Sequence, residues 1–155
     1  KGIKANPGSW YLYSLLGNMY SDTYRQPDFE KAAEVYRKAR ELGAPALTAR
    51  KEFYALARVP SKSREALKLG KELFKDPRNR VPSLVTNIFV LENRLHVPEK
   101  DRIPFRELYP TDEIARDMMT AHLANSLRYP VDGLRETLES LPEANPDDPA
   151  PDGKD

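Results

Sequence analysis

The sequence predicts an all-α fold, an array of antiparallel helix pairs with about seven helices, and three observations support this. Apolar residues recur at helical spacing, as in the stripe of Leu84, Ile88, Leu91 and Leu95, whereas strand patterns are weak. Prolines separate the amphipathic stretches at places where a proline begins or ends a helix at little cost. A pattern of small and large residues also returns after 34 residues, which indicates stacked repeats.

Capping residues and prolines set the expected helix boundaries. Ser9, Asp28 and Thr111 can each accept a hydrogen bond from a backbone N–H at a helix start, as can Ser61 or Ser63. Proline suits the first turn, because its fixed φ matches the helix and its missing N–H needs no partner there. The expected helices, in order, cover residues 9–24, 28–42, 45–57, 61–75, 82–96, 111–127 and 131–141.

Two segments depart from the helical pattern. Three prolines between residues 97 and 110 stand too close together for a full helix, so we expect an irregular segment with a single turn around 105–108. Residues 143–155 contain five acids, one lysine and no large apolar side chain, which predicts an acidic, Pro-rich tail. We therefore expect one helical domain over 1–142, followed by this tail.

A motif near the N-terminus spans the first two expected helices. An aromatic residue, a Leu-Gly pair and a tyrosine are followed by an alanine and a further aromatic residue: Tyr13, Leu16, Gly17, Tyr20, Ala32 and Tyr36. Positions 32, 36 and 39 return 34 residues later as Ala66, Gly70 and Leu73. The chain thereby resembles the tetratricopeptide repeat (TPR) family, clearest over residues 7–45, weaker to 78 and degenerate beyond. The resemblance implies an α–α superhelix and makes residues 1–6 the end of an earlier repeat.

The motif has a packing interpretation. Small residues at positions 17 and 32 allow two helices to cross closely, and large residues fill the space around the crossing. In the second pair Phe53 and Tyr54 replace the Leu-Gly pair, which predicts a wider crossing or a shifted register there. The side chains that we expect to pack helices together are Tyr13, Leu16, Gly17, Tyr20, Ala32, Tyr36, Ala39, Ala66 and Leu73.

The TPR resemblance also implies a function: a concave groove, lined by the first helix of each pair, that binds a peptide or a partner protein. The helix faces opposite the packing residues carry amides, hydroxyls, one tyrosine and two cations, which suit an extended peptide or a helix. Family members that grip chaperone C-termini have a lysine where this chain has Ser14, which argues against a chaperone adaptor. The expected groove residues are Tyr11, Ser14, Asn18, Ser21, Thr48, Lys51, Asn87 and Arg94.

Two other functions stay open on the sequence. Residues 37–80 contain thirteen Lys and Arg against five Asp and Glu, a net charge of +8, which could contact RNA phosphates. Against this, the aromatic residues of the stretch fall on apolar helix faces, whereas bases stack on exposed rings. Because the chain begins at Lys1 without an initiator Met, it could also be a structural or regulatory spacer segment of a larger protein.

Catalysis, cofactors, metal binding and small-molecule ligands are not expected. There is no cysteine and no glycine-rich phosphate loop. His96 and His122 lie 26 residues apart, and neither has a histidine or carboxylate at metal-ligand spacing. No run of eighteen apolar residues is present, so we expect a soluble chain without membrane insertion, cytoplasmic or periplasmic.

Overall fold

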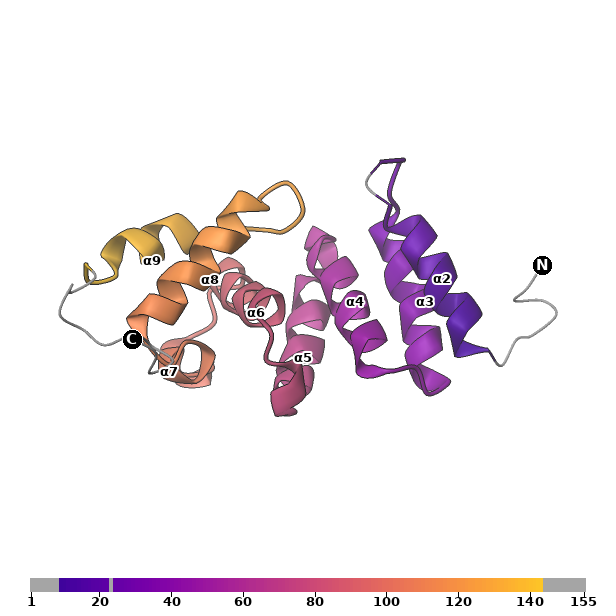
Figure 1. Cartoon of the computed structure of the whole chain (residues 1–155), viewed down its shortest axis with the longest axis horizontal. Helices are drawn as coiled ribbons and strands as arrows, with labels where there is room; N and C mark the ends of the chain where they lie inside the picture. Colours follow the sequence, from indigo (N-terminus) through magenta and orange to yellow (C-terminus); the bar gives the residue numbers. More distant parts are fainter. Residues whose placement is uncertain (1–8, 23, 144–155) are drawn as a thin grey trace, which may run out of the picture.

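The computed structural model describes residues 9–22 and 24–143, and this part of the chain is all-helical (Figure 1). Within these residues it contains eight α-helices, three short 3₁₀ helices and no strand, so the predicted fold class is confirmed. The expected repeat end at 1–6 and the tail from residue 144 onwards lie outside the described residues. The helices are α2 (Trp10–Tyr20), α3 (Phe29–Glu41), α4 (Ala46–Ala57), α5 (Ser63–Phe74), α6 (Pro82–Arg94), α7 (Phe105–Leu108), α8 (Asp112–Ala124) and α9 (Leu134–Ser140).

Helices that follow one another in the chain lie side by side. α2 contacts α3, α3 contacts α4, α4 contacts α5 and α5 contacts α6, so these helices form a one-dimensional array (Figure 1). At the C-terminal end α6 contacts α8, and α8 contacts α9. α4 also contacts α6, and both of these helices contain long buried stretches.

Side-chain caps begin two of the helices as predicted. Asp28 accepts a hydrogen bond from the backbone N–H of Lys31 at the start of α3 (3.1 Å). Thr111 accepts one from the backbone N–H of Ile114 at the start of α8 (3.1 Å). Ser9 precedes α2 without a side-chain cap, so its predicted capping bond is absent.

Two other helix starts differ from the prediction. Neither Ser61 nor Ser63 caps α5, because the 3₁₀ helix Pro60–Lys62 leads directly into it. The Ser63 hydroxyl donates instead to the carbonyl oxygen of Pro60 (2.9 Å). The last helix begins at Leu134 rather than at 131, because Gly133 before it has the left-handed φ of +72° and interrupts the helical backbone.

The first helix pair, α2 and α3, meets where Gly17 faces the ring of Tyr36. A Cβ atom on Gly17 would lie 2.4 Å from Cε1 of Tyr36, so no larger residue fits without a shift of the ring. Ala32 and Ala39 are fully buried on the same face of α3 as Tyr36. Because Gly17 has no side chain, the backbone of α2 can lie directly against the Tyr36 ring on α3.

The second pair, α4 and α5, uses the same device with the roles exchanged. The ring of Phe53 is on α4, and the glycine, Gly70, is on α5. A Cβ atom on Gly70 would lie 2.6 Å from Cε1 of Phe53. Gly70 therefore makes room for the ring of Phe53, and the wider crossing or shifted register expected there stays a prediction.

The other expected packing residues differ in their burial. Ala66 on α5 is fully buried, whereas Leu73 is half-buried and packs against the core. The three large side chains of the α2 motif are also half-buried, which leaves part of each accessible. These three are Tyr13, Leu16 and Tyr20.

The segment 97–110 is irregular, as predicted, apart from the 3₁₀ helix Glu99–Asp101 and the single turn of α7. A buried carboxylate on α6 anchors it: Oε2 of Glu92 accepts a hydrogen bond from the backbone N–H of Ile103 (3.0 Å). Nζ of Lys71 lies 3.4 Å from the same oxygen. The anchored segment returns the chain to α6, so that α8 packs there and the loop after α8 extends towards α4.

Candidate functional site

Three of the expected groove residues, Asn18, Ser21 and Lys51, come together around the hydroxyl of Tyr36. Oδ1 of Asn18 accepts hydrogen bonds from the Tyr36 hydroxyl (2.6 Å) and from Nζ of Lys51 (3.1 Å). Oγ of Ser21 lies 3.2 Å from the same hydroxyl. Burial raises the pKa of Tyr36, so this hydroxyl remains protonated at neutral pH. Since Oδ1 already accepts two bonds, the donor that Asn18 can offer to a ligand is its Nδ2 group.

Three other expected groove residues are buried, and the expectation that they face a partner is wrong. Ser14 is 8 % exposed, Thr48 4 % and Asn87 0 %. Ser14 lies one turn before Gly17, on the face of α2 that meets α3. Thr48 and Asn87 belong to α4 and α6, which have helices packed on several sides and offer no free face at these positions.

The remaining two, Arg94 and Tyr11, take no part in the contacts around the Tyr36 hydroxyl. Nη2 of Arg94 is 2.9 Å from Oδ1 of Asp132, an ion pair that joins α6 to the α8–α9 loop. The charge of Arg94 is therefore used within the fold, and its place in a binding groove stays a prediction. Tyr11 is 57 % exposed and packs edge-on against Trp10, with ring centroids 5.8 Å apart.

A cavity of about 220 Å³ lies where Asn18, Ser21 and Lys51 converge. Its walls come from α2, α3, α4 and the loop between α8 and α9, which lies on the same side of the array as the α2–α3 loop (Figure 1). We call this cavity the basic pocket. It is lined by Asn18, Ser21, Phe29, Tyr36, Lys51, Tyr54, Ala55, Arg58, Arg128 and Tyr129.

The basic pocket has three cations, Lys51, Arg58 and Arg128, and no carboxylate among its lining residues. Within the described part of the chain, none of the three forms an ion pair. Burial, and then the nearby guanidinium of Arg128, lower the pKa of Arg58. The guanidinium of Arg58 also lies over the ring of Phe29, 4.2 Å from its centroid. The pocket therefore holds like charges close together without a counter-charge.

Aromatic contacts hold the α8–α9 loop over the pocket. The ring of Tyr129 lies between His122, at 5.2 Å, and Tyr54, at 5.9 Å between centroids. Nε2–H of His122 donates to the carbonyl oxygen of Pro130 (2.9 Å), and burial lowers the pKa of this histidine. On the other side, Nη2 of Arg58 donates to the carbonyl oxygen of Leu127 (3.2 Å). The loop is thus fixed from both α8 and α4.

Sequence analysis did not identify Arg58, Arg128 or Tyr129. A signal for Arg58 was present, because it lies seven residues after Lys51 and therefore on the same face of α4, two turns on. No local signal pointed to Arg128 and Tyr129. They reach the pocket only because the anchored segment before α8 folds the chain back towards α4.

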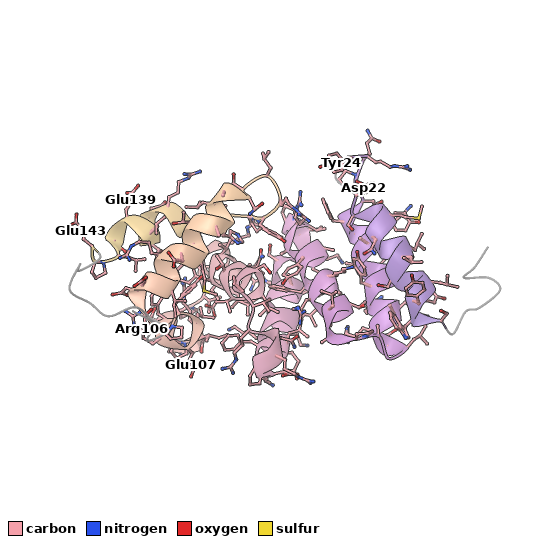
Figure 2. The ribbon with its side chains drawn as sticks, in the orientation of Figure 1. Asp22, Tyr24, Arg106, Glu107, Glu139 and Glu143 are labelled. Carbon is pink, nitrogen blue, oxygen red and sulfur yellow. The ribbon has the colours of Figure 1, made fainter. Side chains whose placement is uncertain are left out.

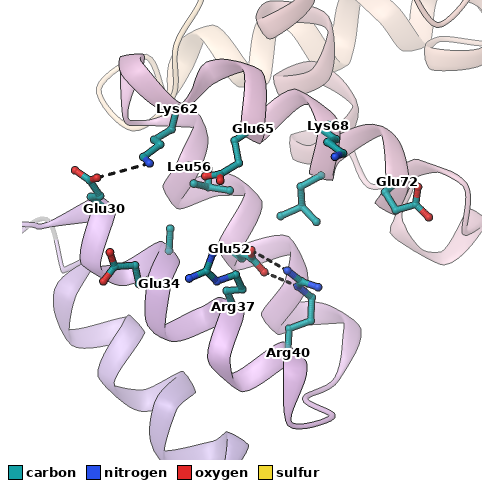
Figure 3. Close-up of a pocket in the computed structure, with 12 residues that line it drawn as sticks. Glu30, Glu34, Arg37, Arg40, Glu52, Leu56, Lys62, Glu65, Lys68 and Glu72 are labelled. Carbon is teal, nitrogen blue, oxygen red and sulfur yellow. Dashed lines mark hydrogen bonds and ion pairs between the residues drawn. The ribbon is translucent and has the colours of Figure 1, made fainter.

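A larger cavity of about 500 Å³ lies between α3, α4 and α5 (Figure 3). Five glutamates and four cations line it. Arg40 donates to both carboxylate oxygens of Glu52, at 2.6 and 3.1 Å, and Nζ of Lys62 lies 3.9 Å from Glu30 (Figure 3). Its charges offset one another, so this groove lacks the single sign of charge that distinguishes the basic pocket.

Two classes of feature are absent from the described residues. No helix there is long and apolar enough to cross a bilayer, and no group of three or more His, Asp or Glu side chains is placed to hold a metal ion. Comparisons of the chain with protein-family models, curated proteins and solved structures find no match. The geometry of the basic pocket is therefore the main guide to function.

Proposed function

We propose that this chain is a protein-interaction module of the TPR kind, which binds a segment of a partner protein in the basic pocket and performs no catalysis. The observation that carries this proposal is the convergence of Asn18 and Lys51 with Arg58 and Arg128 around one cavity. Amide and hydroxyl groups beside cations without a counter-charge offer the hydrogen bonds and the charge that a polar peptide requires.

The helix pairs support the TPR part of the proposal. Tyr36 and Gly70 are 34 residues apart and each lies at the close contact within its own pair. The equivalent positions therefore carry out equivalent packing, although the ring and the glycine have changed places. Such recurrence is expected of repeats that stack on their neighbours.

RNA binding through residues 37–80 has less support from the contacts. Ion pairs with carboxylates already engage five of its cations: Arg40, Lys62, Lys71, Lys75 and Arg78. A cation that is paired within the fold contributes less to phosphate binding than one that is free. The rings of Tyr36, Phe53 and Phe74 are buried, so they offer no stacking surface.

Selection from a random peptide library displayed on phage tests the proposal. We expect the chain to enrich particular peptides, and synthetic copies of them to bind about tenfold or more weakly to Asn18→Ala than to the wild type. Lys38→Ala is a control, since Lys38 is exposed on α3 and does not line the basic pocket. Failure to enrich any peptide, or equal weakening by the control, would contradict the proposal and favour the spacer alternative.

A further inference from the structure

We infer that the bound segment has a carboxylate side chain close to a large apolar side chain, with the carboxylate in the basic pocket and the apolar group in the hollow beside it. This inference rests on the proposed function and adds the chemistry of the ligand. The hollow is formed by Leu15, Met19 and Tyr24 together with Asp22 and three residues of the basic pocket.

The basic pocket has the size and charge for one acidic side chain. Its volume of about 220 Å³ is below the roughly 300–1,000 Å³ of pockets that hold whole small-molecule ligands. Lys51 and Arg58 enter from α4, and Arg128 enters from the opposite loop. A carboxylate between them would supply the missing counter-charge, and a guanidinium can donate two hydrogen bonds to it at once.

The neighbourhood of Arg58 strengthens this argument. Its guanidinium is held against the ring of Phe29 and is joined to the loop by its bond to the Leu127 carbonyl oxygen, so it is ordered before a ligand arrives. Arg128 in contrast is exposed and can turn towards a bound anion. One ordered and one adaptable guanidinium therefore face the same small cavity.

The hollow next to the pocket leaves large apolar side chains exposed. Leu15 is 41 % exposed, Met19 65 % and Tyr24 99 %, and Tyr24 projects from the α2–α3 loop (Figure 2). Single exposed apolar residues are ordinary, but these three line one concave surface. A flexible methionine and an exposed tyrosine suit an apolar side chain of a bound peptide.

The two cavities share part of their lining. Asn18, Ser21 and Arg128 line both of them, so a peptide can pass from one to the other without leaving the surface. Asp22 is the acid of the hollow; it lies 3.9 Å from Arg25 and accepts a hydrogen bond from the backbone N–H of Tyr24. A negative charge in the hollow would be repelled by Asp22, which assigns the carboxylate to the pocket and the apolar group to the hollow.

The test uses the full chain and the peptides obtained from the phage library. We expect the enriched peptides to share a Glu or Asp next to a Leu, Ile, Met or Phe. Replacing that acid by its amide should lower the affinity about tenfold or more, as measured by fluorescence anisotropy. Enriched peptides without an acid would overturn the inference while leaving the proposed function intact.

Protein variants then locate the two groups. Arg128→Gln should lower the affinity for the acidic peptide about tenfold and leave the affinity for the amide peptide unchanged. Met19→Ser should lower the affinity for a peptide with leucine at the apolar position more than the affinity for the same peptide with alanine there. Arg135→Gln is the control, because Arg135 is exposed on α9 and lines neither cavity. Equal loss for acid and amide peptides, or tighter binding of a phosphoserine peptide or an RNA oligomer, would overturn the inference.

Discussion

Gly17 on α2 and Tyr36 on α3 are so close that a Cβ atom on the glycine would lie 2.4 Å from the ring. The hydroxyl of the same tyrosine donates the hydrogen bond that orients Asn18 in the basic pocket. Packing of the first helix pair and geometry of the candidate site therefore depend on one side chain.

Replacement of Gly17 by alanine should lower the free energy of unfolding by about 1–3 kcal/mol, the usual cost of overpacking a close contact. The higher helix propensity of alanine offsets only part of this. Urea unfolding followed by circular dichroism measures the loss. The same Gly17→Ala change, made in a Tyr36→Leu background, should lower the free energy of unfolding by less than it does in the wild type. A loss that is equal in both backgrounds would show that the ring does not cause it.

Gly70→Ala should have the same kind of effect in the second pair. Its Cβ atom would lie 2.6 Å from the Phe53 ring and 3.1 Å from Cγ1 of Ile88, so we again expect a loss of about 1–3 kcal/mol. Phe53→Leu in the Gly70→Ala background should recover part of it. An alanine at position 70 that stabilises the chain would contradict the exchanged arrangement of ring and glycine.

The sequence predicted local features well where one residue determines them. Asp28 and Thr111 cap helices because a cap needs only a side chain and the next turn of backbone. α6 was misjudged, since its leucine stripe indicated one buried face, whereas every residue from Leu84 to Glu92 is buried. That burial results from helices distant in the sequence, which no local pattern describes.

The candidate site shows the same division. Asn18 and Lys51 were found because they lie on a predicted free face of their helices. Arg128 was not, because it reaches the pocket through the anchoring of residues 97–110 on Glu92. Sequence spacing identified positions 36 and 70 as equivalent, but not that a ring at one would be matched by a glycine at the other.

Acidification should weaken the attachment of the α8–α9 loop. Burial places the folded-state pKa of His122 below that of the unfolded chain, which is about 6.5. Between the two values the unfolded state binds more protons, so the stability from neutral His122 is complete above pH about 6.5 and is lost as the pH falls. Unfolding midpoints measured from pH 8 to 5 should fall less in His122→Gln than in the wild type. Equal pH dependence in both proteins would exclude this role.

Removal of Arg128 should separate binding from stability. The Arg128 guanidinium contributes to lowering the pKa of Arg58, which means that the two charges repel each other in the free chain. We therefore expect Arg128→Gln to unfold at the same temperature as the wild type or slightly higher, in differential scanning calorimetry. A decrease as large as that of Gly17→Ala would show that Arg128 has a structural role instead.

Hydrogen exchange measured by mass spectrometry, with and without an enriched peptide, tests the central claim most directly. Binding in the basic pocket predicts slower exchange at the end of α2, in α4 around Lys51–Arg58 and in the loop around Arg128. Exchange at α5, around Glu65 and Glu72 in the charge-balanced groove of Figure 3, should not change. Protection confined to α3 and α5, with none at the α8–α9 loop, would contradict the account.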